Sequence, residues 1–363
     1  MASIFISMSG EGRGHATRMR AIADELRAQH RITIFAPGDA HEIIEPAFRG
    51  SDIPVHEIPC LRFFYTPNGR LDTGRTVAGN AKYILGFRGL LRTLRMHIQQ
   101  GKPDLIITDF EPALPRAARQ CGVPYISLNH QHFLVVNDLS GLPAQLRRHA
   151  FLMSLVVRRY YSKQARTIVS SFYFPPIKPQ YRDRVVQVGV ILRPAVVATP
   201  RADEGHLVAY LRKFALPNVL DALRGCGRPV RLYGLGAKAT DGNIEYREIS
   251  EAGFLRDLGT CSALVTTAGN QLVGEALYLG KPVLAMPEPN NQEQYINAHF
   301  LREEGTGDWI DLDRLTPATL RGFTEKLDEY RSHIVPDKFN GNPLAIKTIE
   351  DFLSSIAEGR ASK

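Results

Sequence analysis

The chain has 363 residues and a formal net charge of +8, and 44% of its residues are hydrophobic. This length exceeds one ordinary hydrophobic core and predicts two α/β domains of a globular protein. No apolar run approaches the roughly 20 residues of a membrane-spanning helix, and no signal-peptide pattern precedes the first predicted strand, so we expect a cytoplasmic protein.

The first half of the chain alternates predicted strands and helices. Strands are predicted at residues 3–8, 31–36, 55–58, 104–108, 125–128 and 167–170, and helices at 16–30, 80–100, 113–121 and 146–164. This alternation indicates a mostly parallel, doubly wound sheet. The cysteines are scattered and form no C-x-x-C pair, which suits reduced thiols.

A second series of the same kind follows a predicted linker near residues 190–200. Strands are predicted at 206–211, 229–233, 244–249, 263–265, 283–286 and 307–312, and helices at 217–224, 251–258, 270–279, 317–330 and 344–356. The carboxyl ends of the strands in such a sheet are where ligands bind.

A glycine-rich turn with Gly10, Gly12 and Gly14 follows the first strand. Its spacing differs from the dinucleotide fingerprint, which would need glycine where His15 stands. His15 begins the next predicted helix, whose dipole disfavours imidazolium, so the side chain can accept a proton. The alternative is a histidine that only caps its helix.

Two carboxylates, Asp109 and Glu111, follow the strand at residues 104–108 and lie at the same predicted sheet edge as His15. Either could orient the histidine or serve as a general base. The alternative for Asp109 is a cap on the helix that follows Pro112.

Residues 263–301 combine a strand, a turn of small residues, a helix and a polar loop. The turn holds Thr267, Ala268 and Gly269, and we expect Asn270 to cap the helix. The N–H groups at such a helix start attract anions. Glu275 lies about one turn further in, and could reach a neighbouring pair of hydroxyls. The pattern predicts a site for a phosphate and a diol.

The sequence gives no reason to predict a metal site. Asp311 and Asp313 resemble a metal-holding D-x-D, but their place between a strand and a helix start indicates solvated or capping carboxylates. His130 and His132 are two residues apart with no further ligand spacing nearby.

Two basic stretches lack acidic residues altogether, at 73–103 and 139–182. We expect an anionic partner for them. The helices near residues 82–102 and 147–166 could seat the protein on an acidic membrane surface. They could also be ordinary half-buried helices whose arginines reach water. No nucleic-acid-binding module accompanies them, so we do not expect nucleic acid as the partner.

The motifs resemble those of GT-B glycosyltransferases. The segment from Gly10 to Arg18 is similar to their N-terminal glycine loop and histidine, and the segments 267–282 and 292–298 are similar to their donor motifs. The nearest pattern is that of glycosyltransferase family 28, the MurG-like enzymes. Asn270 and Gln271 depart from the residues usual in that family, and so should bear on which sugar is carried.

The resemblance implies two Rossmann-like domains facing across a cleft, at residues 1–190 for the acceptor and 191–340 for the donor. A last helix in 341–363 would pack back on the first domain. The implied catalytic residues are His15, Glu111 and Asp109. The implied donor-binding residues are Gly12, Gly14, Arg212, Phe254, Thr267, Ala268, Gly269, Asn270, Gln271, Glu275, Glu293 and Gln294.

The resemblance further implies a metal-independent, inverting transfer from a nucleotide-diphosphate sugar, above all a UDP-sugar, to a hydroxyl acceptor such as a lipid-linked or cell-envelope glycan. No cofactor is implied, because the nucleotide sugar is a co-substrate. Two alternatives remain open at this point. One is a UDP-sugar 2-epimerase of similar fold, and the other is a non-catalytic protein that binds nucleotide sugars or acidic lipids.

Overall fold

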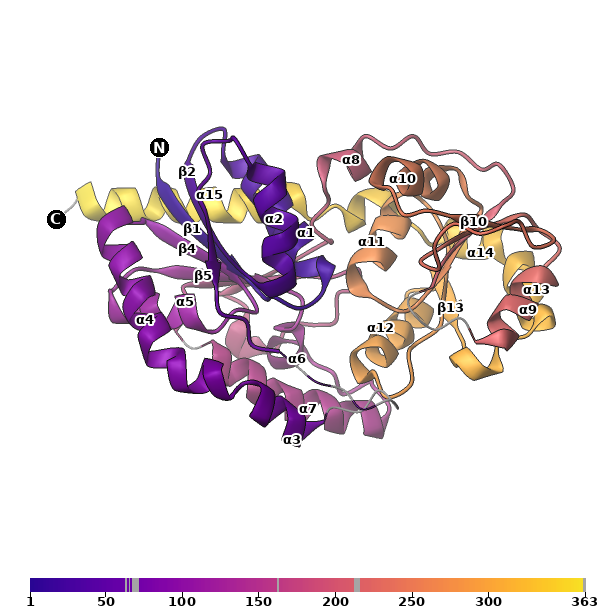
Figure 1. The fold of residues 1–363 in the computed structure, drawn as a ribbon, viewed down its shortest axis with the longest axis horizontal. Helices are drawn as coiled ribbons and strands as arrows, with labels where there is room; N and C mark the ends of the chain where they lie inside the picture. The colour runs from indigo at the N-terminus through magenta and orange to yellow at the C-terminus, as the bar shows by residue number, and fades with distance from the viewer. Residues whose placement is uncertain (63, 65, 67–71, 162, 212–215, 362–363) are drawn as a thin grey trace.

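The computed structural model describes residues 1–62, 64, 66, 72–161, 163–211 and 216–361. Two parallel sheets form two lobes that lie side by side (Figure 1). We call the first sheet with its helices the first lobe, and the second sheet with its helices the second lobe. The predicted α/β fold with two doubly wound sheets is confirmed.

The first sheet has seven strands in the order β3-β2-β1-β4-β5-β6-β7. Its strands are β1 (Ser3–Met8), β2 (Arg31–Pro37), β3 (Val55–Ile58), β4 (Leu105–Asp109), β5 (Tyr125–Asn129), β6 (Arg166–Ser170) and β7 (Val185–Val188). The helices are α1 (Arg13–Leu26), α2 (Gly38–Phe48), α3 (Thr73–Gly79), α4 (Ala81–Gly101), α5 (Ala113–Gln120), α6 (Phe133–Val136) and α7 (Ala144–Tyr160).

The second sheet has six strands in the order β10-β9-β8-β11-β12-β13. They are β8 (Leu207–Tyr210), β9 (Val230–Tyr233), β10 (Ile244–Arg247), β11 (Ala263–Thr266), β12 (Val283–Ala285) and β13 (Gly307–Trp309). The helices of this half are α8 (Pro194–Val197), α9 (Pro217–Arg224), α10 (Glu251–Thr260), α11 (Asn270–Tyr278), α12 (Gln292–Glu303), α13 (Pro317–Glu325) and α14 (Leu327–Ser332), and the chain ends with α15 (Asn342–Ala361).

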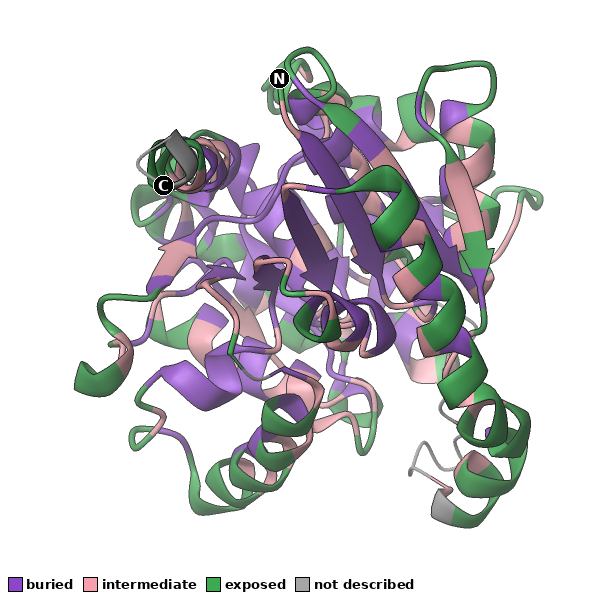
Figure 2. Cartoon of the chain, turned by 90° about the vertical axis from the view of Figure 1, so that its left-hand side faces the viewer, coloured by how far each residue is buried: buried purple, intermediate pink, exposed green. Residues whose placement is uncertain are grey.

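The central strands form because their sequences are apolar runs that helices cover on both faces. Every residue of β1, β4, β5 and β11 is buried, which is the pattern of parallel strands without a solvent face (Figure 2). Several predicted elements have other bounds in the structure, and two of them differ in kind or extent. The helix predicted at 317–330 is two helices that divide at Lys326, and the strand predicted at 307–312 ends at Trp309.

The chain crosses between the lobes twice, and the two crossings are hydrogen-bonded to each other. Val190 pairs with Asn340, and the Gly341 N–H donates to the Val190 carbonyl at 2.9 Å. The Asn342 side chain accepts from the Leu192 N–H at 2.7 Å and donates to its carbonyl at 2.8 Å. The chain then continues into α15, which packs against β7 and α1 of the first lobe (Figure 1).

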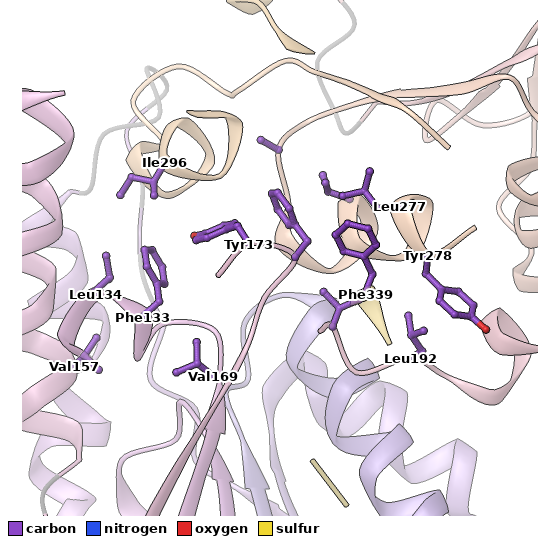
Figure 3. Close-up of a cluster of buried hydrophobic side chains, with 14 of the residues drawn as sticks. Phe133, Leu134, Val157, Val169, Tyr173, Leu192, Leu277, Tyr278, Ile296 and Phe339 are labelled. Carbon is purple, nitrogen blue, oxygen red and sulfur yellow. The ribbon is translucent and has the colours of Figure 1, made fainter. Parts of the chain in front are cut away.

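The hydrophobic core continues from one lobe into the other. Phe133 and Tyr173 of the first lobe, Ile296 and Leu277 of the second, and Phe339 at the crossing belong to one buried cluster (Figure 3). Two further clusters lie within single lobes, and α15 contributes Ala345, Ile349 and Leu353 to that of the first. The lobes are therefore held by apolar packing as well as by the crossings.

Among the described residues, no helix combines the length and the apolar character that a membrane span requires.

We predict that Gly189→Ala destabilises the protein. A Cβ at Gly189 would lie 2.4 Å from the backbone of Phe339, so the two crossings would have to separate. The expected loss is about 1–3 kcal/mol in the free energy of unfolding, measured by urea denaturation. The control is Gly322→Ala inside α13, where nothing lies within 4 Å of the new Cβ. Equal midpoints for Gly189→Ala and the parent protein would contradict the close approach.

Candidate active site

A histidine, an aspartate and an arginine meet where the two central strands of the first sheet end. Asp109 is the last residue of β4, and His15 and Arg18 lie on one face of α1 because they are three residues apart. His15 Nδ1 lies 2.8 Å from Asp109 Oδ1, and an Arg18 terminal nitrogen donates to Oδ2 at 2.6 Å. His15 and Asp109, which the sequence predicted at one sheet edge, are therefore in contact. The sequence assigned no role to Arg18, the second residue that bonds Asp109.

Asp109 is fully buried, and its charge is compensated by these two neighbours. Burial alone would raise the pKa of its carboxyl group, but the Arg18 guanidinium and the His15 ring outweigh this effect and hold the pKa below its usual value. The ionised carboxylate accepts from Nδ1–H, which leaves His15 Nε2 as the ring atom that can accept a proton. Nε2 has no hydrogen-bond partner among the described residues.

Glu111 has a different role in the structure from the one expected. Its two carboxylate oxygens accept from the backbone N–H groups of Ala113 at 2.6 Å and Leu114 at 2.8 Å. The free N–H groups at the start of α5 are therefore bonded by Glu111, and not by Asp109 as the alternative reading of the sequence expected. Burial raises the pKa of Glu111, although these hydrogen bonds oppose the shift. The geometry favours His15 over Glu111 as the base.

The strand, turn and helix predicted from residue 263 onward are formed. β11 ends at Thr266, and Thr267, Ala268 and Gly269 lead into α11, for which Gly269 is the N-cap. The N–H groups of the first helical turn have no acceptor within the helix, and the helix dipole makes their end positive. In Figure 1 the start of α1 faces α11 across the junction of the lobes.

Asn270 does not cap α11, which corrects the expectation from sequence. It is the first helical residue, and its side chain reaches the first lobe, where it donates to the Ser170 carbonyl at 3.2 Å and lies 3.4 Å from the Phe172 N–H. Gln271 turns to the other side and donates to the Ile191 carbonyl at 2.8 Å. A Cβ at Gly14 would lie 3.8 Å from Gln271 Cβ, so the glycine loop approaches this residue closely.

Glu275 is buried inside the second lobe and is held by two side chains. Gln271 donates to one of its oxygens at 3.0 Å, and Arg193 lies 3.4 Å from the other. Arg193 also pairs with Glu251 at the start of α10. The Gln271 Oε1 atom is buried and lacks a hydrogen-bond partner among the described residues. Buried unpaired acceptors are costly, so this atom is a natural place for a ligand donor.

The polar loop before α12 brings Glu293 toward the His15 cluster. Burial raises the pKa of Glu293, while the electrostatic effects of His15 and Arg18 act in the opposite direction. Gln294, in the first turn of α12, bonds back to the loop: it accepts from the Glu288 N–H at 2.7 Å and donates to the Glu288 carboxylate at 3.1 Å.

A buried polar network joins the lobes behind this site. Asn297 of α12 donates to the Ala268 carbonyl at 2.8 Å and accepts from the Tyr173 hydroxyl at 2.9 Å. His130 Nε2 lies 3.3 Å from the same Asn297 oxygen, and burial lowers the pKa of His130 to about 3. His130 is therefore a neutral structural group that helps to fix the turn at Ala268.

The remaining predicted residues have less to do with the junction. Phe254 of α10 packs against Tyr210 and Tyr233 inside the second lobe. Gly12 is the N-cap of α1 with φ 82°, a left-handed conformation that favours glycine. Arg212 lies outside the described residues. Among the residues that the structure describes, no cluster of three His, Cys, Asp or Glu could hold a metal ion.

A family model described as glycosyl transferase family 1 matches residues 2–328 of this chain. The chain belongs to glycosyl transferase family 1. An uncharacterised glycosyltransferase of Methanosarcina mazei is 24% identical to it over 91% of this chain and 92% of its own. A second, from Methanosarcina acetivorans, is 23% identical over 99% of this chain and 100% of its own.

Solved glycosyltransferase structures share the whole fold with this member of family 1. The calicheamicin glycosyltransferase CalG4 superposes with a TM-score of 0.68 at 19% identity and covers 98% of this chain and 99% of its own. The MurG of Acinetobacter baumannii gives 0.61 at 15% identity, covering 98% and 100%. Phytolacca americana UGT2, complexed with UDP-2fluoro-glucose and pterostilbene, gives 0.70 at 13% identity, covering 98% and 99%. The GT-B fold expected from the motifs is thus confirmed.

We predict that Asp109→Asn costs about 3 kcal/mol of unfolding free energy near neutral pH, because it leaves the buried Arg18 charge without its partner. Asp109 has a folded pKa below its unfolded value, so its ionised form stabilises the protein above the unfolded pKa. This contribution is lost as the pH falls through the folded pKa, where the protonated acid resembles asparagine.

The stability difference between the two proteins should therefore be full at pH 7 and shrink below the ordinary value of 3.8, measured by urea unfolding across the pH range. A difference that stays constant with pH would contradict an ionised Asp109.

Proposed function

We propose that this glycosyltransferase moves a sugar, a hexose in particular, from a nucleotide-diphosphate sugar, foremost a UDP-sugar, to a hydroxyl acceptor with inversion at the anomeric carbon. The observation that carries the proposal is the contact of His15 with the buried Asp109, opposite the free N-terminus of α11. A proton acceptor and an anion site then face one another across the junction of the lobes. We expect the donor on the second lobe and the acceptor on the first.

His15 is the proposed general base. Asp109 positions the ring and stabilises the positive charge that develops when Nε2 takes the proton from the acceptor hydroxyl. The acceptor oxygen then bonds to the anomeric carbon, and the bond from that carbon to the diphosphate oxygen breaks. Arg18 keeps Asp109 ionised throughout, which supports its role as a positioning residue.

The leaving diphosphate is proposed to bind the backbone of residues 268–271 at the start of α11, with a metal-independent stabilisation of its charge by the helix dipole. Glu275 would accept hydrogen bonds from the ribose hydroxyls after exchanging its contacts with Arg193 and Gln271. Glu293 is proposed to contact the sugar, because it lies near His15 and keeps no hydrogen bond to a described residue.

The acceptor is proposed to approach along the first lobe, and a lipid-linked or cell-envelope glycan would suit it. Phe110 follows Asp109 and stacks on His15 with ring centroids 6.2 Å apart, and Tyr160 lies 5.1 Å from Phe110. These half-buried aromatic rings beside the base support an acceptor with apolar or sugar-ring surface.

A panel of UDP-, GDP- and TDP-sugars, screened by thermal shift, tests the donor site. We expect donors of one nucleotide class to raise the unfolding temperature of the parent protein. Glu275→Ala should abolish this shift, because losing the hydrogen bonds to the ribose hydroxyls should lower the donor affinity about tenfold or more. The control is Glu304→Ala, which removes a carboxylate paired with Lys338 at the far end of α12. No shift with any donor, or an equal shift in Glu275→Ala, would remove the proposal.

Turnover of the donor that binds, followed as release of the nucleoside diphosphate, tests the base. His15→Ala should lower the rate about 10²- to 10⁴-fold and leave the donor-induced thermal shift intact, and chelation by EDTA should change neither. An epimerised free sugar would indicate a 2-epimerase instead. Rates that are indifferent to His15→Ala would speak for a binding protein.

A further inference from the structure

The outer face of α7 carries apolar side chains in the open, framed by arginines. Phe151, Leu152 and Leu155 are 64%, 51% and 50% exposed. Exposed arginines precede and follow them at positions 147, 148, 158 and 159. At 100° per residue these seven side chains fall within an arc of about 140°. The opposite face, with Ala150, Ser154 and Val157, is buried.

The outer face of α4 repeats this arrangement. Ile84 and Leu85 are 56% and 84% exposed, and the exposed Arg88 and Arg92 follow on the same side of the helix. The buried residues Leu90, Leu94 and Ile98 lie on the other side. Ordinary half-burial of these helices would place their apolar side chains inward, which is not what these five exposed residues of α4 and α7 do.

The side chain of Arg116 connects the two helices. Arg116 of α5 lies between them: its guanidinium stacks 5.3 Å from the Phe87 ring of α4 and donates to the Arg159 carbonyl of α7 at 3.4 Å. In Figure 1, α4 descends along the left side of the molecule toward the lower edge, where α7 lies. We define the basic-apolar face as Ile84, Leu85, Arg88, Arg92, Arg147, Arg148, Phe151, Leu152, Leu155, Arg158 and Arg159.

We propose that the basic-apolar face docks on an anionic lipid bilayer. Apolar side chains at the centre can enter the acyl boundary, while arginines at the rim meet anionic headgroups. The segments 73–103 and 139–182 contain no acidic residue that would oppose such a surface. The positive charge and the exposed apolar side chains of this face are thus both complementary to an anionic bilayer.

The other occupants fit less well. A second copy of the chain would meet this face with the same face, so arginine would lie opposite arginine. Nucleic acid would use the arginines but leave Phe151, Leu152 and Leu155 without a favourable contact, since no base-stacking module accompanies them.

The basic-apolar face is connected to the candidate active site through aromatic contacts. α7 ends at Tyr160, which contacts Phe110, and Phe110 stacks on His15. A docked protein would therefore present the base side of the junction near the membrane surface. The docking proposal does not depend on the proposed function, because it needs neither donor nor base.

Vesicle flotation of the full chain tests the proposal. We expect the protein to float with vesicles of phosphatidylcholine and phosphatidylglycerol in equal parts, and not with phosphatidylcholine alone. The double variant Arg148→Glu with Arg159→Glu should lose binding at least about tenfold, given the contribution of each basic residue near an anionic surface. Phe151→Ser with Leu155→Ser should also lose binding, because both charge and apolar area are required.

The matched charge control is Arg314→Glu with Lys347→Glu, which makes the same net change at residues 76% and 69% exposed elsewhere. The matched apolar control is Val335→Ser, at a residue 59% exposed. Both should bind as the parent protein does. All variants are first shown to keep the parent unfolding temperature and the donor-induced thermal shift, so that a failure of docking is separate from a failure of the donor site.

Three results would overturn the proposal. Equal flotation with neutral and anionic vesicles would contradict an electrostatic contribution to binding. An equal loss of vesicle binding in the control variants would show that binding does not depend on the basic-apolar face. A dimer in solution that the Phe151 and Leu155 variants dissociate would show that a second copy covers this face.

Discussion

A buried carboxylate that must be neutralised organises the reactive corner of this glycosyltransferase. Asp109 ends β4 in the interior of the protein, and a charge there is stable only with partners. Both partners, His15 and Arg18, come from α1, and the Ser9 N–H also bonds the Asp109 carbonyl at 2.7 Å. The turn between β1 and α1 is thereby held against β4. The position of the histidine ring follows from charge compensation, and its chemistry follows from that position.

The second requirement of the site is that the two lobes remain in contact. Asn297 links Ala268, in the turn between β11 and α11, to Tyr173 of the first lobe, and Asn270 bonds the Ser170 carbonyl. Because these groups are buried, separating the lobes would expose or orphan them. The start of α11 and the His15–Asp109 pair are thus parts of one structure, and a ligand at Glu275 would displace the contacts of this carboxylate with Arg193 and Gln271.

The sequence was sufficient for the fold and for part of the site. Apolar runs alternating with amphipathic helices determine parallel sheets, and the ends of neighbouring parallel strands must meet, which brings His15 to Asp109. The roles of Asp109 and Glu111 were harder to assign. Phe110 has φ 55°, a left-handed conformation that directs Glu111 back over α5. No local sequence pattern predicts this conformation at a phenylalanine. Asn270 was misassigned as a cap because its partner belongs to the other lobe, about a hundred residues away in sequence.

The paired crossings at Val190 and Asn340 have a consequence for how such a protein can be built and varied. Both ends of the segment between them lie side by side, and α15 returns the chain to the lobe in which it began. The second lobe is therefore topologically an insertion in a single host domain. Such a lobe could be exchanged between relatives through one junction, which would change the proposed donor site while both chain termini and the first lobe stay in place.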